Sequence, residues 1–136
     1  MYELFEHTAD LGIRVYAGSV DELFADAARG LFAVMVTNFK AVLPVEEATF
    51  QVAGNNLEEL LHDWLSELLY TFYTRRLVLG DFRVQVGAAG LSAVARGEPL
   101  DPQRHEIDGE VKAITWHGLK VEQLADRWRA EVIVDM

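Results

Sequence analysis

His7 and Asp10 are the first residues in the chain whose types and spacing could support chemistry. They enclose the sequence His7-Thr8-Ala9-Asp10, between a short first strand and a predicted strand that starts at Leu11. A histidine and an aspartate close together at a strand junction can bind a metal ion or act as an acid–base pair. The structural alternative is that Asp10 caps a turn and His7 is a partly buried aromatic residue. On these four residues alone, the structural alternative is the more common outcome.

The end of the chain carries two further acidic groups, the side chain of Asp135 and the α-carboxylate of Met136. Most termini fray, but an alternating pattern that starts at Trp128 predicts a strand that holds this end in a sheet. Asp10 would complete a set of three carboxylates, which suits a hard cation such as Ca²⁺ or Mg²⁺. A divalent cation would relieve the repulsion among them. The sequence therefore predicts a cation site if the fold brings Asp10 and Asp135 together.

A third segment, Val111-Lys112-Ala113-Ile114-Thr115-Trp116-His117, places a lysine, a hydroxyl group and a histidine close together in sequence. The structural interpretation is a short amphipathic segment that leads into a strand, with Trp116 in the core. A nucleophilic Ser or Thr needs a base and an orienting acid, and nothing nearby indicates them. The chain also lacks the G-x-S-x-G, P-loop, G-x-G-x-x-G and H-E-x-x-H motifs. The sequence therefore gives little support to an enzyme.

The composition excludes several classes of protein. The chain has 136 residues, of which 51% are apolar, so it can form one domain and is not a disordered tail. No apolar run approaches the ~20 residues that span a bilayer, and the first ten residues include acidic ones where a secretory signal has basic and then apolar residues, so we expect a cytoplasmic protein. The absence of cysteine excludes disulfides and thiolate metal ligands. A net charge of −10 disfavours direct binding to nucleic-acid phosphates.

Two segments have the spacing of amphipathic helices. The capping-box sequence Ser19-Val20-Asp21-Glu22 starts the first helix, whose apolar stripe continues to Met35. Asn56, with two glutamates after it, starts the second helix, which reaches Arg75 and Arg76. The second helix is apolar on one side only, so we expect it to lie across a sheet. Its apolar residues are Leu57, Leu60, Leu61, Trp64, Leu65, Leu68, Leu69 and Phe72.

The remaining segments alternate between apolar and polar residues, which is typical of strands. Gly87-Ala88-Ala89-Gly90 predicts a hairpin connection. Six or seven strands with two long helices predict an α+β fold, a two-layer sandwich whose helices pack on a mainly antiparallel sheet. We expect residues 1–136 to form a single domain. The predicted strands cover residues 11–17, 48–52, 82–86, 91–95, 119–121 and 128–134.

Three segments in this order and at this spacing resemble the archease family. They are His7-Thr8-Ala9-Asp10 near the start, Val111-Lys112-Ala113-Ile114-Thr115-Trp116-His117 in the last third, and Val134-Asp135-Met136 at the end. The resemblance covers essentially the whole chain, including both helices. Met136 is a departure, because family members commonly end in Ile or a similar aliphatic residue.

The resemblance implies a non-catalytic accessory protein that assists a GTP-dependent RNA ligase of the tRNA-splicing (RtcB) type, promoting its guanylylation and multiple turnover. An earlier association of the family is with a tRNA methyltransferase, as a chaperone-like modulator. The family's metal site, usually described with Ca²⁺, would fall on Asp10, Asp135 and Met136, with Mg²⁺ or Mn²⁺ as alternatives. Lys112 matches a family motif position and would contact or activate the partner, and His7 is a further candidate for that role.

Three alternatives remain open from the sequence. A small metal-dependent hydrolase would use His7, Asp10 and His117 with a bound water. A chaperone-like modulator of a methyltransferase would share the fold and the site but differ in its partner. A direct tRNA-binding module would depend on Arg75, Arg76 or Lys112, and the negative net charge makes it the least favoured of these classes.

Overall fold

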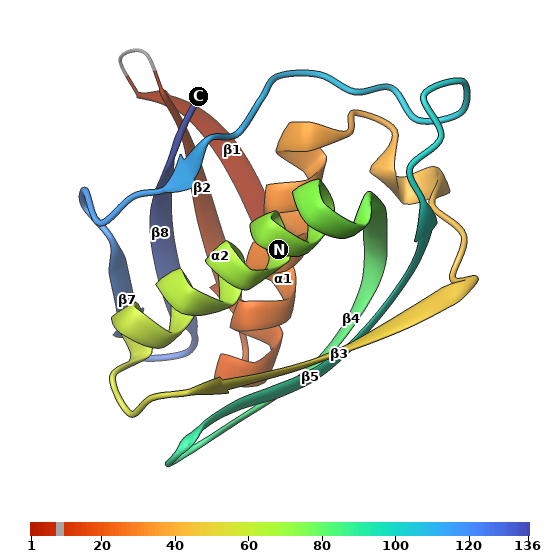
Figure 1. Cartoon of the computed structure of the whole chain (residues 1–136). Helices are drawn as coiled ribbons and strands as arrows, with labels where there is room; N and C mark the ends of the chain where they lie inside the picture. The colour runs from red at the N-terminus through yellow and green to blue at the C-terminus, as the bar shows by residue number, and fades with distance from the viewer. Residues whose placement is uncertain (8–9) are drawn as a thin grey trace.

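Within residues 1–7 and 10–136, which the computed structural model describes, eight strands form two antiparallel sheets around two long helices (Figure 1). The smaller sheet has the order β3 (Glu46–Ala53), β5 (Gly90–Pro99), β4 (Leu77–Gly87). The larger sheet has the order β1 (Tyr2–His7), β2 (Asp10–Ala17), β8 (Trp128–Asp135), β6 (Ala113–Ile114), and β7 (Lys120–Gln123) also pairs with β8. The predicted α+β fold with two long helices is confirmed, but the strands divide into two sheets.

Helix α1 (Val20–Met35) lies between the two sheets and packs on both of them. It starts at Ser19, whose Oγ accepts the backbone N–H of Glu22 at 3.2 Å, as the capping pattern predicted. The helix is buried around most of its circumference because it contacts both β2 and β4, which belong to different sheets. A Cβ added at Gly30 would lie 2.7 Å from Cγ2 of Ile13 on β2. Because Gly30 has no side chain, strand β2 of the larger sheet can approach one side of α1 closely. The other side of α1 packs on β4 of the smaller sheet.

Helix α2 (Leu57–Arg75) also contacts both sheets. Oδ1 of Asn56 accepts the backbone N–H of Glu59 at 3.0 Å, and the helix ends at Arg76 in the left-handed conformation, φ 53°. The indole N–H of Trp64 donates to the carbonyl of Phe24 at 3.0 Å and joins the two helices. The predicted stripe is buried except for Leu57, which is partly buried; its buried residues are Leu60, Leu61, Trp64, Leu65, Leu68, Leu69 and Phe72.

The hairpin predicted at 87–90 joins β4 to β5, with Gly87 paired opposite Gly90. Strand β4 begins at Leu77, directly after the helix and before the predicted start at residue 82. Its register with β5 shifts between Leu79 and Asp81, which marks a β-bulge.

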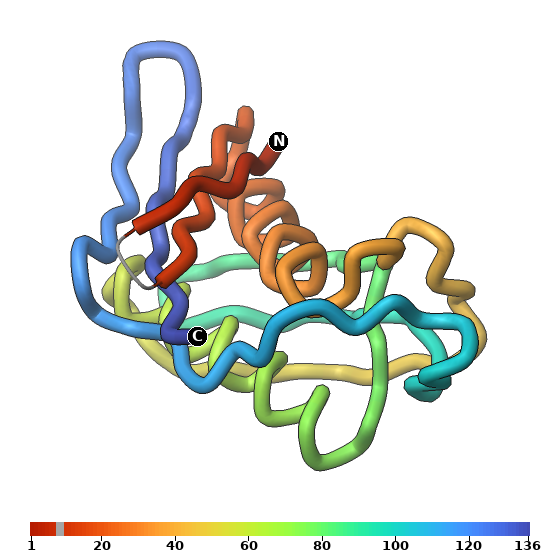
Figure 2. The backbone as a smooth tube through the Cα atoms, turned by 90° about the horizontal axis from the view of Figure 1, so that it is seen from above, coloured from red at the N-terminus to blue at the C-terminus, as the bar shows by residue number. Residues whose placement is uncertain are grey.

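The larger sheet holds the end of the chain in place. Strand β8 pairs with β2 on one side and with β6 and β7 on the other, so the predicted pinning of the C-terminus by sheet pairing is confirmed. The C-terminus consequently lies beside the ends of β1 and β2 (Figure 2).

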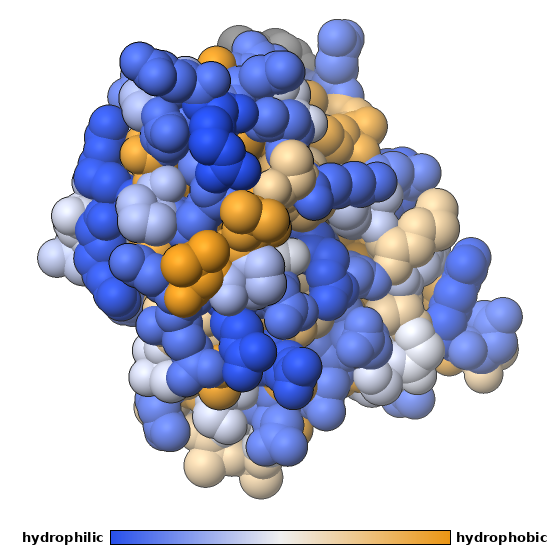
Figure 3. Space-filling model, turned by 90° about the vertical axis from the view of Figure 1, so that its right-hand side faces the viewer, coloured by the Kyte–Doolittle hydropathy of each residue, from blue (hydrophilic) through white to orange (hydrophobic). Residues whose placement is uncertain are grey.

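Hydrophilic residues cover most of one side of the molecule (Figure 3). Figure 3 shows a side on which hydrophilic residues surround a small group of apolar ones. Within the described residues, no helix is both long and apolar enough to cross a membrane.

Candidate metal and partner-binding site

Asp10 and Asp135 meet at one end of the larger sheet. Strands β2 and β8 are antiparallel, and Leu11 pairs with Val134. Asp10 precedes Leu11 and Asp135 follows Val134, so the two aspartates lie one position beyond the last pair, and a continued register sets them opposite each other. Residues directly opposite in an antiparallel pair point to the same face, with Cβ atoms roughly 5 Å apart. The cation site predicted from the sequence required the fold to bring Asp10 and Asp135 to the same place, and the fold does so.

The charges of these two carboxylates are not compensated within the part of the chain that the structure describes. Asp135 is exposed and Asp10 is half-buried, and neither forms an ion pair with a described Lys, Arg or His. Like charges directly opposite each other in a sheet are destabilising. This oxygen-only pair fits a hard cation in donor type.

The pair needs at least one more donor to hold a cation. No three His, Cys, Asp or Glu side chains among residues 1–7 and 10–136 are grouped to bind a metal ion. The third ligand expected from the sequence, the α-carboxylate of Met136, is not a side-chain group and follows Asp135 directly. The residues fit the cation only if this group takes part.

Met136 is held against the loop that precedes β6. Its side chain is partly buried against the core, and its Cε lies 2.7 Å from the position of a Cβ added at Gly109. Gly109 has φ +65°, a conformation that favours glycine. The last residue therefore has a defined place beside the carboxylate pair.

Lys112 joins the same end of the sheet through its backbone. Its N–H donates to the carbonyl of Asp135 at 2.7 Å, and its side chain is exposed. The preceding residue, Val111, accepts a hydrogen bond of 2.7 Å from the hydroxyl of Tyr73 on α2. Burial, and then the negative charge of Glu110, raise the pKa of Tyr73, which keeps this donor protonated at neutral pH. Lys112 thus lies next to Asp135 through its backbone, and its exposed ammonium group forms no ion pair with the residues that the structure describes.

His7 lies at the same end, on the other side of Asp10. It pairs with Asp10 across the β1–β2 register, and its ring contacts that of His117, with centroids 5.3 Å apart. Its Nδ1 is buried and has no hydrogen-bond partner in the described part of the chain. Thr8 and Ala9, in the middle of the first motif, lie outside the described residues.

The structure thus brings the three sequence motifs together at one end of one sheet. The hydrolase candidates His7, Asp10 and His117 are neighbours here as well. Arg75 and Arg76, which were considered for RNA binding, are exposed at the C-terminal end of α2.

Sequence reasoning missed His62 and misplaced Trp116. We expected Trp116 in the core, but it is 56% exposed. Its indole stacks on the His62 imidazole of α2, with centroids 3.8 Å apart and planes 12° apart. The strand containing Ile114 directs that residue inward, and the chain turns outward after Thr115, which explains the error. The helical periodicity around His62 gave no signal that it would contact a segment 52 residues away.

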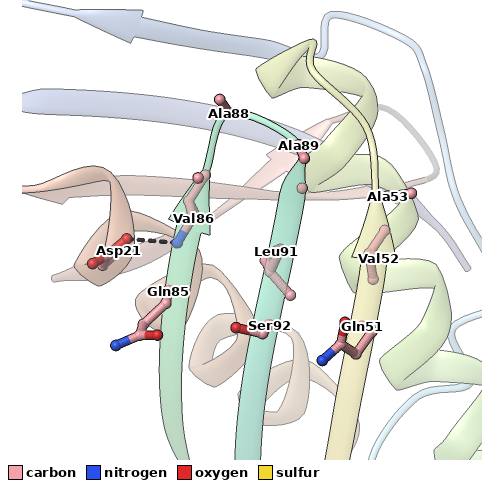
Figure 4. A pocket seen from close by; sticks show the side chains of 12 residues that line it. Asp21, Gln51, Val52, Ala53, Gln85, Val86, Ala88, Ala89, Leu91 and Ser92 are labelled. Atoms are coloured by element: carbon pink, nitrogen blue, oxygen red, sulfur yellow. Dashed lines mark hydrogen bonds between the residues drawn. The ribbon is translucent and has the colours of Figure 1, made fainter.

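A shallow hollow on the other sheet does not compete as the functional site. Figure 4 shows the polar side chains of Gln51, Ser92 and Gln85 in a row across β3, β5 and β4, as their register requires. The one acidic residue of its lining, Asp21, accepts the backbone N–H of Val86 at 2.8 Å. The lining residues named for this hollow therefore include no carboxylate without a hydrogen bond and no histidine or lysine.

Comparison with known proteins agrees with the family that these motifs resemble. Residues 2–136 match the model of the Archease protein family (MTH1598/TM1083). The chain is 42% identical to protein archease of Methanopyrus kandleri over 139 aligned positions, covering 99% of each protein. It is 43% identical to protein archease of Pyrococcus furiosus, covering 99% of this chain and 98% of that protein.

Two solved structures have a similar fold. The solution structure of Methanobacterium thermoautotrophicum protein 1598 matches with a TM-score of 0.85 and 32% identity, covering 99% of this chain and 98% of that one. The crystal structure of an archease from Thermotoga maritima, described as a possible chaperone, matches with a TM-score of 0.67. At 22% identity, over 100% of this chain and 98% of that one, this second match supports the fold alone. From the family match and the curated relatives, this chain belongs to the archease family.

Proposed function

We propose that this chain is a non-catalytic accessory protein that binds a divalent cation, with Ca²⁺ the first candidate, and activates a GTP-dependent RNA ligase of the tRNA-splicing type. The family implies this role, and the observation that carries it here is the placement of Asp10 opposite Asp135 with Lys112 bonded to the same strand end.

Two features of this strand end support a binding role over catalysis. The carboxylates are accessible and without ion-pair partners among the described residues, so they can take up a cation without first breaking a bond. The hydroxyl of Thr115, the candidate nucleophile of the third motif, donates to the carbonyl of Ile133 and accepts the N–H of His117, so no base orients it.

In this account each residue has a distinct task. Asp10 and Asp135 bind the cation from adjacent strands, and Met136 completes the set through its carboxylate, which Gly109 helps to position. The bound cation supplies positive charge that removes the repulsion between the aspartates. The backbone of Lys112 is bonded to Asp135, and its exposed side chain contacts an acidic or phosphate group of the ligase.

The test is ligase guanylylation with catalytic amounts of the accessory protein. We expect Asp10→Ala and Asp135→Ala to lose the stimulation, and Asp126→Ala, an exposed aspartate of the β7–β8 turn, to retain it. Circular dichroism and thermal unfolding must show that all three variants are folded. Undiminished stimulation by folded Asp10→Ala and Asp135→Ala proteins would contradict the proposal.

The hydrolase alternative is tested on the protein alone. Phosphoesters and nucleotides incubated with it, with and without Ca²⁺, Mg²⁺ or Mn²⁺, should remain intact. Metal-dependent turnover that Asp10→Ala abolishes would support the hydrolase instead.

A further inference from the structure

Trp116 is an exposed aromatic side chain held in a fixed orientation. It is 56% exposed, and the imidazole of His62 covers one face of its ring at 3.8 Å between centroids. His62 is only slightly exposed and contacts two acceptors, the carbonyl of Ile114 at 3.0 Å from Nε2 and Oδ1 of Asp63 at 3.2 Å from Nδ1. The residue beneath the indole therefore cannot turn away without losing these contacts.

The loop that carries Trp116 is fixed as well. The hydroxyl of Thr115 donates to the carbonyl of Ile133 at 2.9 Å and accepts the N–H of His117 at 3.2 Å. The ring of His117 contacts His7 on β1. Trp116 is thus preorganised on both sides, and preorganised aromatic side chains lose little conformational freedom when they bind.

The residue that Trp116 stacks on, His62, contacts Asp63, which belongs to an acidic face of α2. Glu59, Asp63 and Glu67 are exposed and follow one another at four-residue spacing, so they share one side of the helix. Neither Glu59 nor Glu67 pairs with a Lys or Arg among the described residues. Like charges at this spacing repel and weaken a helix, and a basic partner surface would compensate them.

We propose that Trp116 is the anchor by which this chain docks on its protein partner, in an apolar pocket rimmed by Arg and Lys side chains that face Glu59 and Glu67. The proposal rests on the proposed function, in which that partner is the RNA ligase. In this proposal the chain contacts its partner in two places. One is the end of the sheet that carries Asp10 and Asp135, and the other is Trp116 on the loop that follows β6.

The acidic rim distinguishes a protein partner from RNA. An RNA base could stack on an indole, but the adjoining phosphates would face Glu59, Asp63 and Glu67. A protein pocket meets no such repulsion, and Trp is among the residues most enriched at the energetic centres of protein interfaces.

The experiment measures the affinity of purified ligase for the full-length chain by titration calorimetry, together with Ca²⁺ binding and guanylylation. We expect Trp116→Ala to weaken ligase binding by about 30-fold or more, the size of an interface hot spot, with Ca²⁺ affinity unchanged. Tyr70→Ala is the matched control, because Tyr70 is 65% exposed on α2 and lacks a stacking partner among the described residues. The double variant Glu59→Gln, Glu67→Gln leaves the stack intact and should bind the ligase with lower affinity.

The outcomes separate the two proposals. If Trp116→Ala binds and stimulates the ligase like the wild type while Asp10→Ala does not stimulate, the anchor is overturned and the proposed function stands. If the wild type neither binds nor stimulates the ligase, the proposed function fails, and the anchor falls with it. If Trp116→Ala loses binding to tRNA instead, and Glu59→Gln, Glu67→Gln strengthens that binding, the occupant is RNA and the proposed protein partner is wrong.

Discussion

The methyl end of Met136 occupies the space that a side chain at Gly109 would need, 2.7 Å from an added Cβ. Gly109 belongs to the segment that leads from β5 to β6, where the N–H of Asp108 also donates to the carbonyl of Met35, the last residue of α1, at 3.0 Å. The position of the last residue, and with it the proposed third ligand, thus depends on a glycine distant in sequence.

Gly109→Ala should weaken cation binding. Gly118 is a matched control, because it has φ +64° against +65° for Gly109 but no atom within 4 Å of an added Cβ. Both substitutions should cost about 1 kcal/mol of stability from the left-handed backbone. Only Gly109→Ala should also lower Ca²⁺ affinity, measured by calorimetry. Equal Ca²⁺ affinities in the two variants would show that the Met136 contact does not matter.

Gly97→Ala should be severely destabilising. An added Cβ would lie 1.9 Å from the carbonyl oxygen of Val78 on β4, and backbone in a buried strand pair cannot move aside easily. We expect a loss of at least about 3 kcal/mol in the free energy of unfolding. Gly87→Ala, with nothing nearer than 3.9 Å, is the control and should be close to neutral. Chemical denaturation measures both, and similar midpoints for the two variants would contradict the packing described for β4 and β5.

The free energy of unfolding should decrease as the pH is lowered past about 6.5, the usual pKa of histidine. His105 is the residue responsible. His105 is buried, and burial followed by the charge of Arg104 lowers its pKa. Its Nδ1 accepts the N–H of Asp101 at 2.9 Å, so the neutral ring carries its proton on Nε2, 3.4 Å from Oε1 of Glu98. Below pH 6.5 the unfolded chain takes up a proton that the folded chain resists, so stability decreases as the pH falls.

The effect involves a single proton, which limits how steeply the free energy of unfolding can change with pH. Urea unfolding should show a loss of up to about 1.4 kcal/mol per pH unit from this group between pH 6.5 and its lowered folded pKa. His105→Asn should flatten this part of the profile relative to the wild type. An identical slope in the variant would assign the pH dependence to other groups.

The helices could be predicted from the sequence because their signals are local. Ser19 and Asn56 each cap a helix by accepting a backbone N–H three residues further along the chain. The apolar spacing of each helix is likewise visible without information about the rest of the chain. Strand β4 was predicted to start too late. Leu77, Val78 and Leu79 are all buried, so they lack the alternation of a strand with one exposed face, and they follow the helix with only Arg76 between.

The candidate site could be predicted only in part, for a related reason. The motif residues are local features, but the pairing of Asp10 with Asp135 depends on the register of strands from opposite ends of the chain. The stack of Trp116 on His62 depends on where the loop after β6 meets α2. Neither contact has a spacing signal in the sequence, and Trp116 was assigned to the core because a large aromatic residue is usually buried there.

The proposed function depends on a cation held by Asp10 and Asp135 at adjacent strand ends. Titration calorimetry of the metal-free protein with Ca²⁺ tests it most directly, with Asp10→Asn, Asp135→Asn and the control Asp126→Asn. The account predicts one Ca²⁺ bound per chain by the wild type and the control, and no measurable binding by the other two variants. Unchanged Ca²⁺ binding by folded Asp10→Asn and Asp135→Asn proteins would contradict it.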